Sequence, residues 1–187
     1  VRGGTEDGLR WNIGAFHTTN EDDILFQTSG GPQANVGFFD NVGDTRRAGI
    51  ELGVSQQLSR VRWFLEYSLI EATFEDDFVI NSPNHPILEE DETAPQIVGD
   101  EKLQVVSGAT IPGIPRHQGN VGLDFAFSEQ LSFGADLVLR SGVYLRGDEV
   151  NLLGKTDSYA IVNLRGQYRL ANGVALFPRI ENAFDQE

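Results

Sequence analysis

The feature of this sequence that most constrains its fold is a two-residue alternation between residues 160 and 181. Every second position from Ala160 to Leu170 is apolar or small, and a short turn at residues 171–173 separates this stretch from a second alternating one. Successive side chains of a β-strand point to opposite faces, so the pattern predicts an antiparallel hairpin with one apolar face. Its other face is largely polar and carries Asn163, Arg165, Gln167, Arg169, Arg179 and Glu181.

Two kinds of protein contain such a hairpin. A soluble β-sandwich buries the apolar face against a second sheet, whereas a membrane β-barrel turns that face to lipid and keeps a polar lumen. The charged face suits either solvent or a wide, water-filled lumen. The hairpin alone therefore leaves both folds open.

Length and hydropathy narrow the class of protein. A chain of 187 residues can form one domain with a sizeable core, and nothing in it indicates two domains. Mean hydropathy is -0.26, and no apolar run approaches the roughly 18 residues that a membrane-spanning helix needs. A helical membrane protein is thus excluded. A membrane β-barrel is not excluded, because its strands alternate apolar and polar residues and therefore have a low mean hydropathy.

Cysteine and methionine are both absent from the chain. A cysteine-free chain fits an envelope protein of a Gram-negative bacterium. Because the chain opens on Val1 and has no start methionine or signal peptide, we expect it to be a piece of a longer protein.

The net charge of -14 is concentrated in one part of the chain. Nine acidic residues and no Lys or Arg lie between Glu75 and Glu101, which excludes a nucleic-acid partner. Asp76-Asp77 and the run 89–92 could chelate a hard cation such as Ca²⁺ through oxygen ligands. The glycine and ligand spacing of an EF-hand are missing, so a solvated acidic loop is the favoured interpretation and no metal site is expected.

The two-residue period recurs along the chain and predicts further strands at residues 9–18, 48–55, 61–69, 121–127 and 131–140. After the first of these, the polar residues Asn20 to Asp23 interrupt the pattern, and the apolar positions switch from odd to even at Ile24. By local rules this interruption is a turn or a bulge.

Connections between the predicted strands are short at residues 59, 129 and 172 and long at residues 75–116 and 142–157. The long segment 75–116 holds five of the seven prolines and has no sustained period, so we expect a functional or mobile loop. Strict alternation of short and long connections places all long loops at one end. Outer-membrane barrels show this asymmetry, and a sandwich has no reason for it.

Five segments of the chain occur in the order seen in the C-terminal part of TonB-dependent receptors. The chain therefore resembles the carboxy-terminal third of such a barrel, and the resemblance implies about seven strands of a 22-stranded antiparallel, up-and-down transmembrane β-barrel. These receptors import ferric siderophores, cobalamin, metal complexes or sugars. The segments are NVGDTRRAGIELG (41–53), IPGIPRH (111–117), YLRGDE (144–149), YAIVNL (159–164) and ENAFDQ (181–186).

The resemblance also implies location and partners. We expect residues 1–187 to form a partial barrel domain in the outer membrane of a Gram-negative bacterium, in contact with lipid and the rest of the barrel. The plug domain, the TonB box that reaches the TonB complex and the last strand with its terminal aromatic residue are expected to lie outside the chain. The resemblance further predicts one long strand from Leu9 to Thr28, with Asn20 to Asp23 as a bulge, beside a descending segment from Asn35 to Leu58.

Three function classes were compared. The favoured one is a fragment of a receptor that imports a chelated nutrient, with a ferric siderophore as the expected cargo and no resident cofactor. The alternative is a soluble β-sandwich binding or adhesin-like module. An enzyme is excluded because no nucleophile, base and orienting group converge, and the three histidines show no zinc-ligand spacing. These are His17, His85 and His117.

Ligand recognition in a barrel receptor is expected at the long-loop end. The loops there are Ser29 to Gln33, 75–116 and 142–157. We predict ligand contacts from the basic residues and the tyrosine nearest this end, since Tyr144 could stack on an aromatic ligand group. The predicted contact residues are Arg116, Arg140, Tyr144 and Arg146.

Overall fold

The computed structural model describes residues 1–5, 8–28 and 37–186, which form an almost entirely β-structured chain. The predicted loop Ser29 to Gln33, and the first residues of the predicted descending segment, lie outside the described residues.

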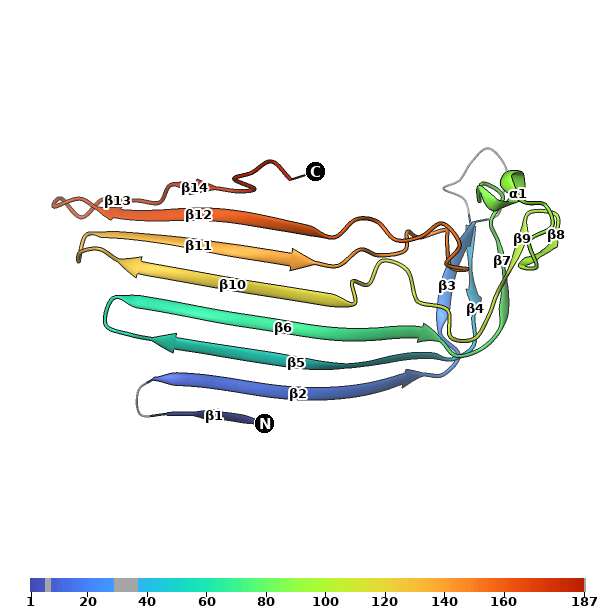
Figure 1. Ribbon diagram of the computed structural model, residues 1–187, viewed down its shortest axis with the longest axis horizontal. Helices are drawn as coiled ribbons and strands as arrows, with labels where there is room; N and C mark the ends of the chain where they lie inside the picture. Colours follow the sequence, from blue (N-terminus) through green and yellow to red (C-terminus); the bar gives the residue numbers. More distant parts are fainter. Residues whose placement is uncertain (6–7, 29–36, 187) are drawn as a thin grey trace.

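Antiparallel strands form the wall of the molecule, and each long strand pairs with its neighbours in chain order (Figure 1). The short strand β1 (Arg2–Gly4) pairs with one edge, and β13 (Ala175–Leu176) and β14 (Arg179–Ile180) pair with the other. The predicted all-β, up-and-down order is therefore confirmed. The long strands are β2 (Leu9–Asn20), β5 (Thr45–Gln57), β6 (Val61–Phe74), β10 (His117–Ala126), β11 (Leu131–Arg140) and β12 (Tyr159–Arg169).

The two ends of the wall differ as the connection lengths predict. Short turns join β5 to β6, β10 to β11 and β12 to β13 at one end, and the longer connections gather at the other (Figure 1). The connection from β11 to β12 has no strand or helix of its own among residues 141–158.

The two faces of the wall have opposite chemistry. Leu137 lies opposite Val162 on one face, and Asp136 lies opposite Asn163 on the other. Apolar side chains of the first face are about half exposed rather than buried, as at Ile13 (50%) and Phe133 (53%). No second sheet covers this face in the described part of the chain, so a β-sandwich does not describe the fold.

The hydrophobic core lies beyond the long-loop end of the wall. Its buried side chains come from three connections and the end of β6, and they are Val42, Phe74, Ile80, Leu103, Val105, Ala109 and Val150. We call residues 20–45, 75–116 and 142–157, as far as they are described, the loop cap. The cap is thus a folded unit with its own core, whereas the apolar face of the wall depends on whatever surrounds it.

The prediction of one strand from Leu9 to Thr28 with a bulge is wrong. β2 ends at Asn20, and β3 (Ile24–Thr28) pairs with β4 (Gly37–Asn41) in a separate two-stranded sheet that turns away from the wall (Figure 1). The last pair of the wall is Asn20–Thr45, and the first pair of the β3–β4 ribbon is Ile24–Asn41. Three residues lie between these pairs on each strand, 21–23 and 42–44. A bulge has an extra residue on one strand only, so this interruption is not a bulge. Positive φ angles at Asp22 (53°) and Gly43 (74°) mark a kink on both sides instead.

The connection 75–116, predicted as a functional or mobile loop without a sustained period, contains short elements of secondary structure. This segment contains β7 (Phe78–Asn81), a one-turn helix α1 (Ile87–Glu90), β8 (Ile97–Gly99) and β9 (Lys102–Val105). The three strands form a small sheet in the order β7-β9-β8. Each is too short to show a period in the sequence, and burial of Ile80, Leu103 and Val105 holds them together.

The hairpin at residues 171–173 is confirmed, but its second strand is broken. β13 and β14 keep one register against β12, and Phe177 and Pro178 separate them. Gly166 N–H donates to the Pro178 carbonyl at 2.9 Å, and proline has no N–H to return the bond. The ladder is therefore interrupted at this residue.

Among the described residues, no helix is long and apolar enough to cross a membrane.

The facing of the wall predicts different outcomes for neighbouring substitutions on β12. Val162→Arg puts a charge on the apolar face, which costs about 2–4 kcal/mol near the middle of a bilayer. Asn163→Arg adds the same charge beside Asp136 on the polar face and is expected to be mild. The amount of folded receptor in the membrane, measured by heat-modifiable gel mobility, should fall for the first variant only. Equal loss from both variants would contradict the assigned faces.

Candidate functional site

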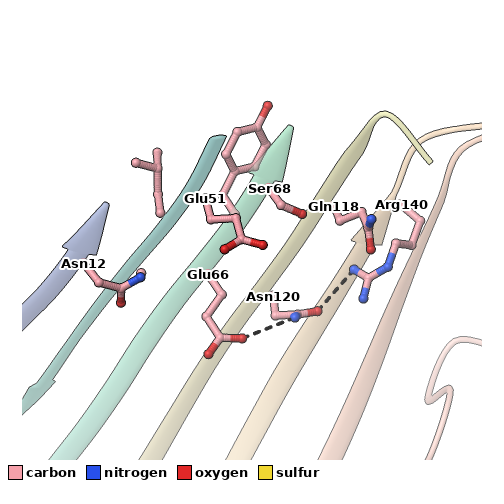
Figure 2. A pocket seen from close by; sticks show the side chains of 10 residues that line it. Asn12, Glu51, Glu66, Ser68, Gln118, Asn120 and Arg140 are labelled. Atoms are coloured by element: carbon pink, nitrogen blue, oxygen red, sulfur yellow. Dashed lines mark hydrogen bonds between the residues drawn. The ribbon is translucent and has the colours of Figure 1, made fainter. Parts of the chain in front are cut away.

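The polar face of the wall carries a hollow of about 270 Å³ that is lined by residues of five strands, β2, β5, β6, β10 and β11 (Figure 2). Asn12, Glu51 and Glu66 reach it from β2, β5 and β6, because the two-residue period brings these positions to one face. Asn120 Nδ2 donates to Glu66 Oε2 at 3.4 Å, and Arg140 Nη1 donates to Asn120 Oδ1 at 3.2 Å. A chain of polar contacts therefore runs from β6 through β10 to β11.

Arg140 is held against the wall rather than extended from it. Its Nη1 also donates to the carbonyls of Gly119 at 3.1 Å and Leu139 at 2.7 Å. A guanidinium has five N–H donors, so some donors stay free for a ligand or a neighbouring segment.

A second polar network lies nearer the short turns. Arg165 forms ion pairs with Asp124 and Asp136, and Asn163 Nδ2 donates to Asp136 Oδ2 at 2.8 Å. The guanidinium passes over β11 at Gly134, where an added Cβ would overlap Asp124 Oδ1 and Arg165 Nε. Glycine at this position therefore permits a charge-assisted contact across β11.

At the loop end, a hollow of about 180 Å³ lies beside the top of β6. Arg116 and Tyr144 both line it, and Arg116 forms an ion pair with Glu71. The Lys155 ammonium lies 5.1 Å from the centroid of the Tyr144 ring, which is within cation–π range. This hollow combines two cations, one aromatic ring and apolar walls.

A larger hollow of about 650 Å³ lies between the β3–β4 ribbon and the other parts of the cap. Its lining includes the Phe26 and Phe39 rings, whose centroids are 5.5 Å apart at an interplanar angle of 70°. Arg146 and Glu149 line it from the β11–β12 connection. Its volume is in the range of small-molecule sites.

The four predicted contact residues do not form one site. Arg116 and Tyr144 share the smaller loop hollow, Arg146 lines the larger one, and Arg140 lines the polar wall. All four are at or near the loop end of the wall. Their location at the loop end agrees with the predicted location, whereas their contact with a ligand remains a prediction.

Sequence reasoning missed a buried acid–histidine pair that joins two parts of the cap. His85 Nε2 lies 3.2 Å from Asp148 Oδ1, and both side chains are 1% exposed. Because Ile87 N–H donates to His85 Nδ1 at 3.2 Å, Nδ1 is the acceptor nitrogen of the ring, and Nε2 is the one that faces Asp148. The second Asp148 oxygen accepts from Leu153 N–H at 3.0 Å. No spacing in the sequence links residues 63 positions apart.

Asp23 lies at the kink between wall and cap, and it also lines the larger hollow. The Thr45 hydroxyl donates to its Oδ2 at 2.6 Å, and this bond is the main cause that lowers the pKa of Asp23 from its ordinary value of 3.8. Partial burial opposes the shift, while Ile24 N–H, Asn20 and Arg47 add to it. The ionised carboxylate is therefore the form that stabilises the kink.

No cluster of three or more His, Asp or Glu side chains is placed to hold a metal ion in the described ranges.

Comparison with known proteins identifies the class. The family described as TonB dependent receptor-like, beta-barrel matches residues 1–183. The chain therefore belongs to the TonB-dependent receptor β-barrel family, whose members are outer-membrane transporters and receptors of Gram-negative bacteria. A search among curated proteins gives no match.

Solved structures share the fold at low sequence identity. They include the copper transporter OprC (21% identity, TM-score 0.64) and BauA, the ferric preacinetobactin receptor from Acinetobacter baumannii (14%, 0.61). A mutant of the ferric enterobactin receptor PfeA from Pseudomonas aeruginosa is 21% identical, with a TM-score of 0.60. The matches cover 97%, 95% and 97% of this chain but only 24%, 23% and 24% of those chains. The chain thus spans about a quarter of their length.

The Asp23 carboxylate predicts a pH-dependent contribution to stability. Its folded-state pKa is depressed, so its contribution is present above the unfolded-state value and is lost as pH falls through the folded-state value. Asp23→Asn should therefore destabilise the receptor by about 1 kcal/mol at neutral pH, and by less in acid. Thermal unfolding of both proteins between neutral pH and pH 3 measures the difference. Asp100→Asn, at an exposed turn, is the control, and an Asp23 difference that stays constant with pH would refute the assignment.

Proposed function

We propose that this segment is part of an outer-membrane receptor that takes up a chelated nutrient, with a ferric siderophore as the expected cargo. The observation that carries the proposal is the convergence of long connections into a folded cap at one end of the wall. That cap contains one hollow of ligand size and borders a smaller one beside β6, and a polar face continues below it. A ligand entering from the loop end would meet the hollows first.

A chelate fits this segment better than a bare metal ion. The solved structures with this fold include a copper transporter as well as siderophore receptors, so the fold does not decide the cargo. A bare copper ion prefers sulfur or clustered imidazole ligands, and this chain contains no cysteine or methionine. Two of its histidines already have partners, since His85 contacts Asp148 and His117 Nδ1 lies 2.8 Å from the Tyr67 hydroxyl.

The proposed contact residues divide into two groups. Tyr144 and Arg116, together with Lys155, offer a ring and two cations in one hollow. Arg146 borders the larger hollow, and Arg140 lies on the polar face below the cap. We propose that Arg116, Tyr144 and Lys155 contact the cargo. Arg140 contacts either the cargo or the segment that fills the lumen.

The remaining partners follow from the family. Outer-membrane lipid would cover the apolar face, other strands of the barrel would pair with β1 and β14, and a plug domain with a TonB contact would complete the receptor. An open sheet edge cannot persist in hydrocarbon, because its N–H and C=O groups have no water to bond. The wall therefore needs those strands.

The proposal is tested in the full-length receptor under iron limitation. Uptake of ⁵⁵Fe by cells that depend on this receptor should require TonB. Arg116→Ala and Tyr144→Ala should each lower uptake about tenfold, which corresponds to about 1.4 kcal/mol, without changing receptor abundance. Ser59→Ala and Asn172→Ala, at the short-turn end, are the matched controls and should leave uptake unchanged. TonB-independent uptake would refute the transport proposal, and loss at the control positions alone would mean that the long-loop end is not the ligand end.

A further inference from the structure

Glu149 is a buried carboxylate that forms no ion pair among the described residues. It is 8% exposed and lines the larger hollow of the cap. Its one hydrogen bond among the described residues comes from Gly147 N–H to Oε1 at 3.1 Å, and it takes part in no ion pair there. The residues outside the described ranges contain no Lys or Arg. Burial of an unpaired charge is unfavourable, so the site favours a cation supplied from outside this chain.

The basic residues of the hollow do not fill this role. Arg47 pairs with Asp23 at 3.6 Å and donates to Thr45 Oγ1 at 3.1 Å. Arg146 is exposed, so water screens its charge, whereas burial leaves the charge of Glu149 much less screened. Glu149 is the buried one of the four charged residues that line the hollow, and unlike Asp23 it has no basic partner among the described residues.

Two aromatic rings that line the same hollow are exposed. Phe26 is 48% and Phe39 is 74% exposed, although their edge-to-face contact holds them together. A ring face attracts a cation by its quadrupole, and a carboxylate beside aromatic rings is a common way to bind an organic ammonium group. The exposed rings and the buried carboxylate are independent features of one hollow, and both favour a cation.

The charge of the whole cap has the same sign. The cap segments 20–45, 75–116 and 142–157 contain 17 acidic and 4 basic residues, which account for 13 of the 14 net negative charges of the chain. The wall is almost neutral by comparison. The field at the loop end therefore concentrates cations and opposes polyanions.

We propose that the larger hollow binds a protonated amine of the incoming chelate, with the ammonium at Glu149 and its carbon chain against Phe26 and Phe39. This receptor then takes up chelates of neutral or positive net charge that carry such an amine. A metal ion does not fit as the occupant, because a hard cation needs several oxygen ligands and no group of three or more acidic or imidazole side chains is placed to hold one among the described residues. The inference rests on the proposed uptake function and specifies its ligand.

A matched pair of chelates tests the proposal. The ferric complex of desferrioxamine B is a hydroxamate chelate with a free ammonium group, and N-acetylation removes that charge while keeping the metal centre. A catecholate chelate with a free amine and its acetylated form make a second pair. Binding of all four to the purified full-length receptor is measured by tryptophan fluorescence and isothermal titration.

At least one amine-bearing chelate should bind about tenfold or more tightly than its acetylated form. Glu149→Gln should remove that preference, whereas Glu92→Gln, which removes an equal charge from an exposed part of the cap, should preserve it. If Glu149→Gln impairs folding, Phe39→Ala should weaken the same preference severalfold. The proposal is overturned if both forms bind equally, if neither amine-bearing chelate binds, or if the preference survives Glu149→Gln. TonB-dependent ⁵⁵Fe uptake can persist in each of those cases. The uptake function and the ammonium site are therefore tested by different measurements.

Discussion

The antiparallel ladder from β2 to β12 is the interaction on which the rest of the structure depends. Each long strand inside it is bonded on both edges, and the register places like side chains together on each face. Neither face contains a packed core, so the ladder is stabilised within the chain by backbone bonds and cross-strand pairs. Such a wall needs lipid on one side and polar contents on the other, which is the arrangement of the family to which the chain belongs.

The cap, in contrast to the wall, is stabilised by a buried hydrophobic core. Its core buries side chains from three separate connections, and the His85–Asp148 pair joins two of them. Asn151 acts in the same way, because its side-chain amide donates to and accepts from the backbone of Thr110. These contacts hold the three connections of the cap in one arrangement before a ligand binds. Preorganisation lowers the entropic cost of ligand binding.

The sequence predicted the wall well because a half-exposed strand has a visible two-residue period. Residues 131–140 were predicted as a strand, and β11 has those bounds. The cap could not be predicted in this way, since β7, β8 and β9 have three or four residues each and their partners are set by burial. The proposed role of Glu149 depends on a hollow that is lined both by β3 and by a connection more than 100 residues later, and no local pattern encodes this arrangement. The resemblance that identified the family also suggested one continuous first strand, and the paired φ angles at Asp22 and Gly43 show why the chain kinks instead.

The proposed function requires that one face of the wall meets lipid and the other faces a polar lumen, with the cap above both. Spin labels placed singly at residues 160–165 of β12, in the intact receptor in bilayers, distinguish these two faces. Oxygen accessibility should be high at 160, 162 and 164 and low at the three intervening positions, while a water-soluble relaxing agent should show the opposite alternation. Uniform accessibility along the strand, or alternation of the opposite phase, would contradict the account.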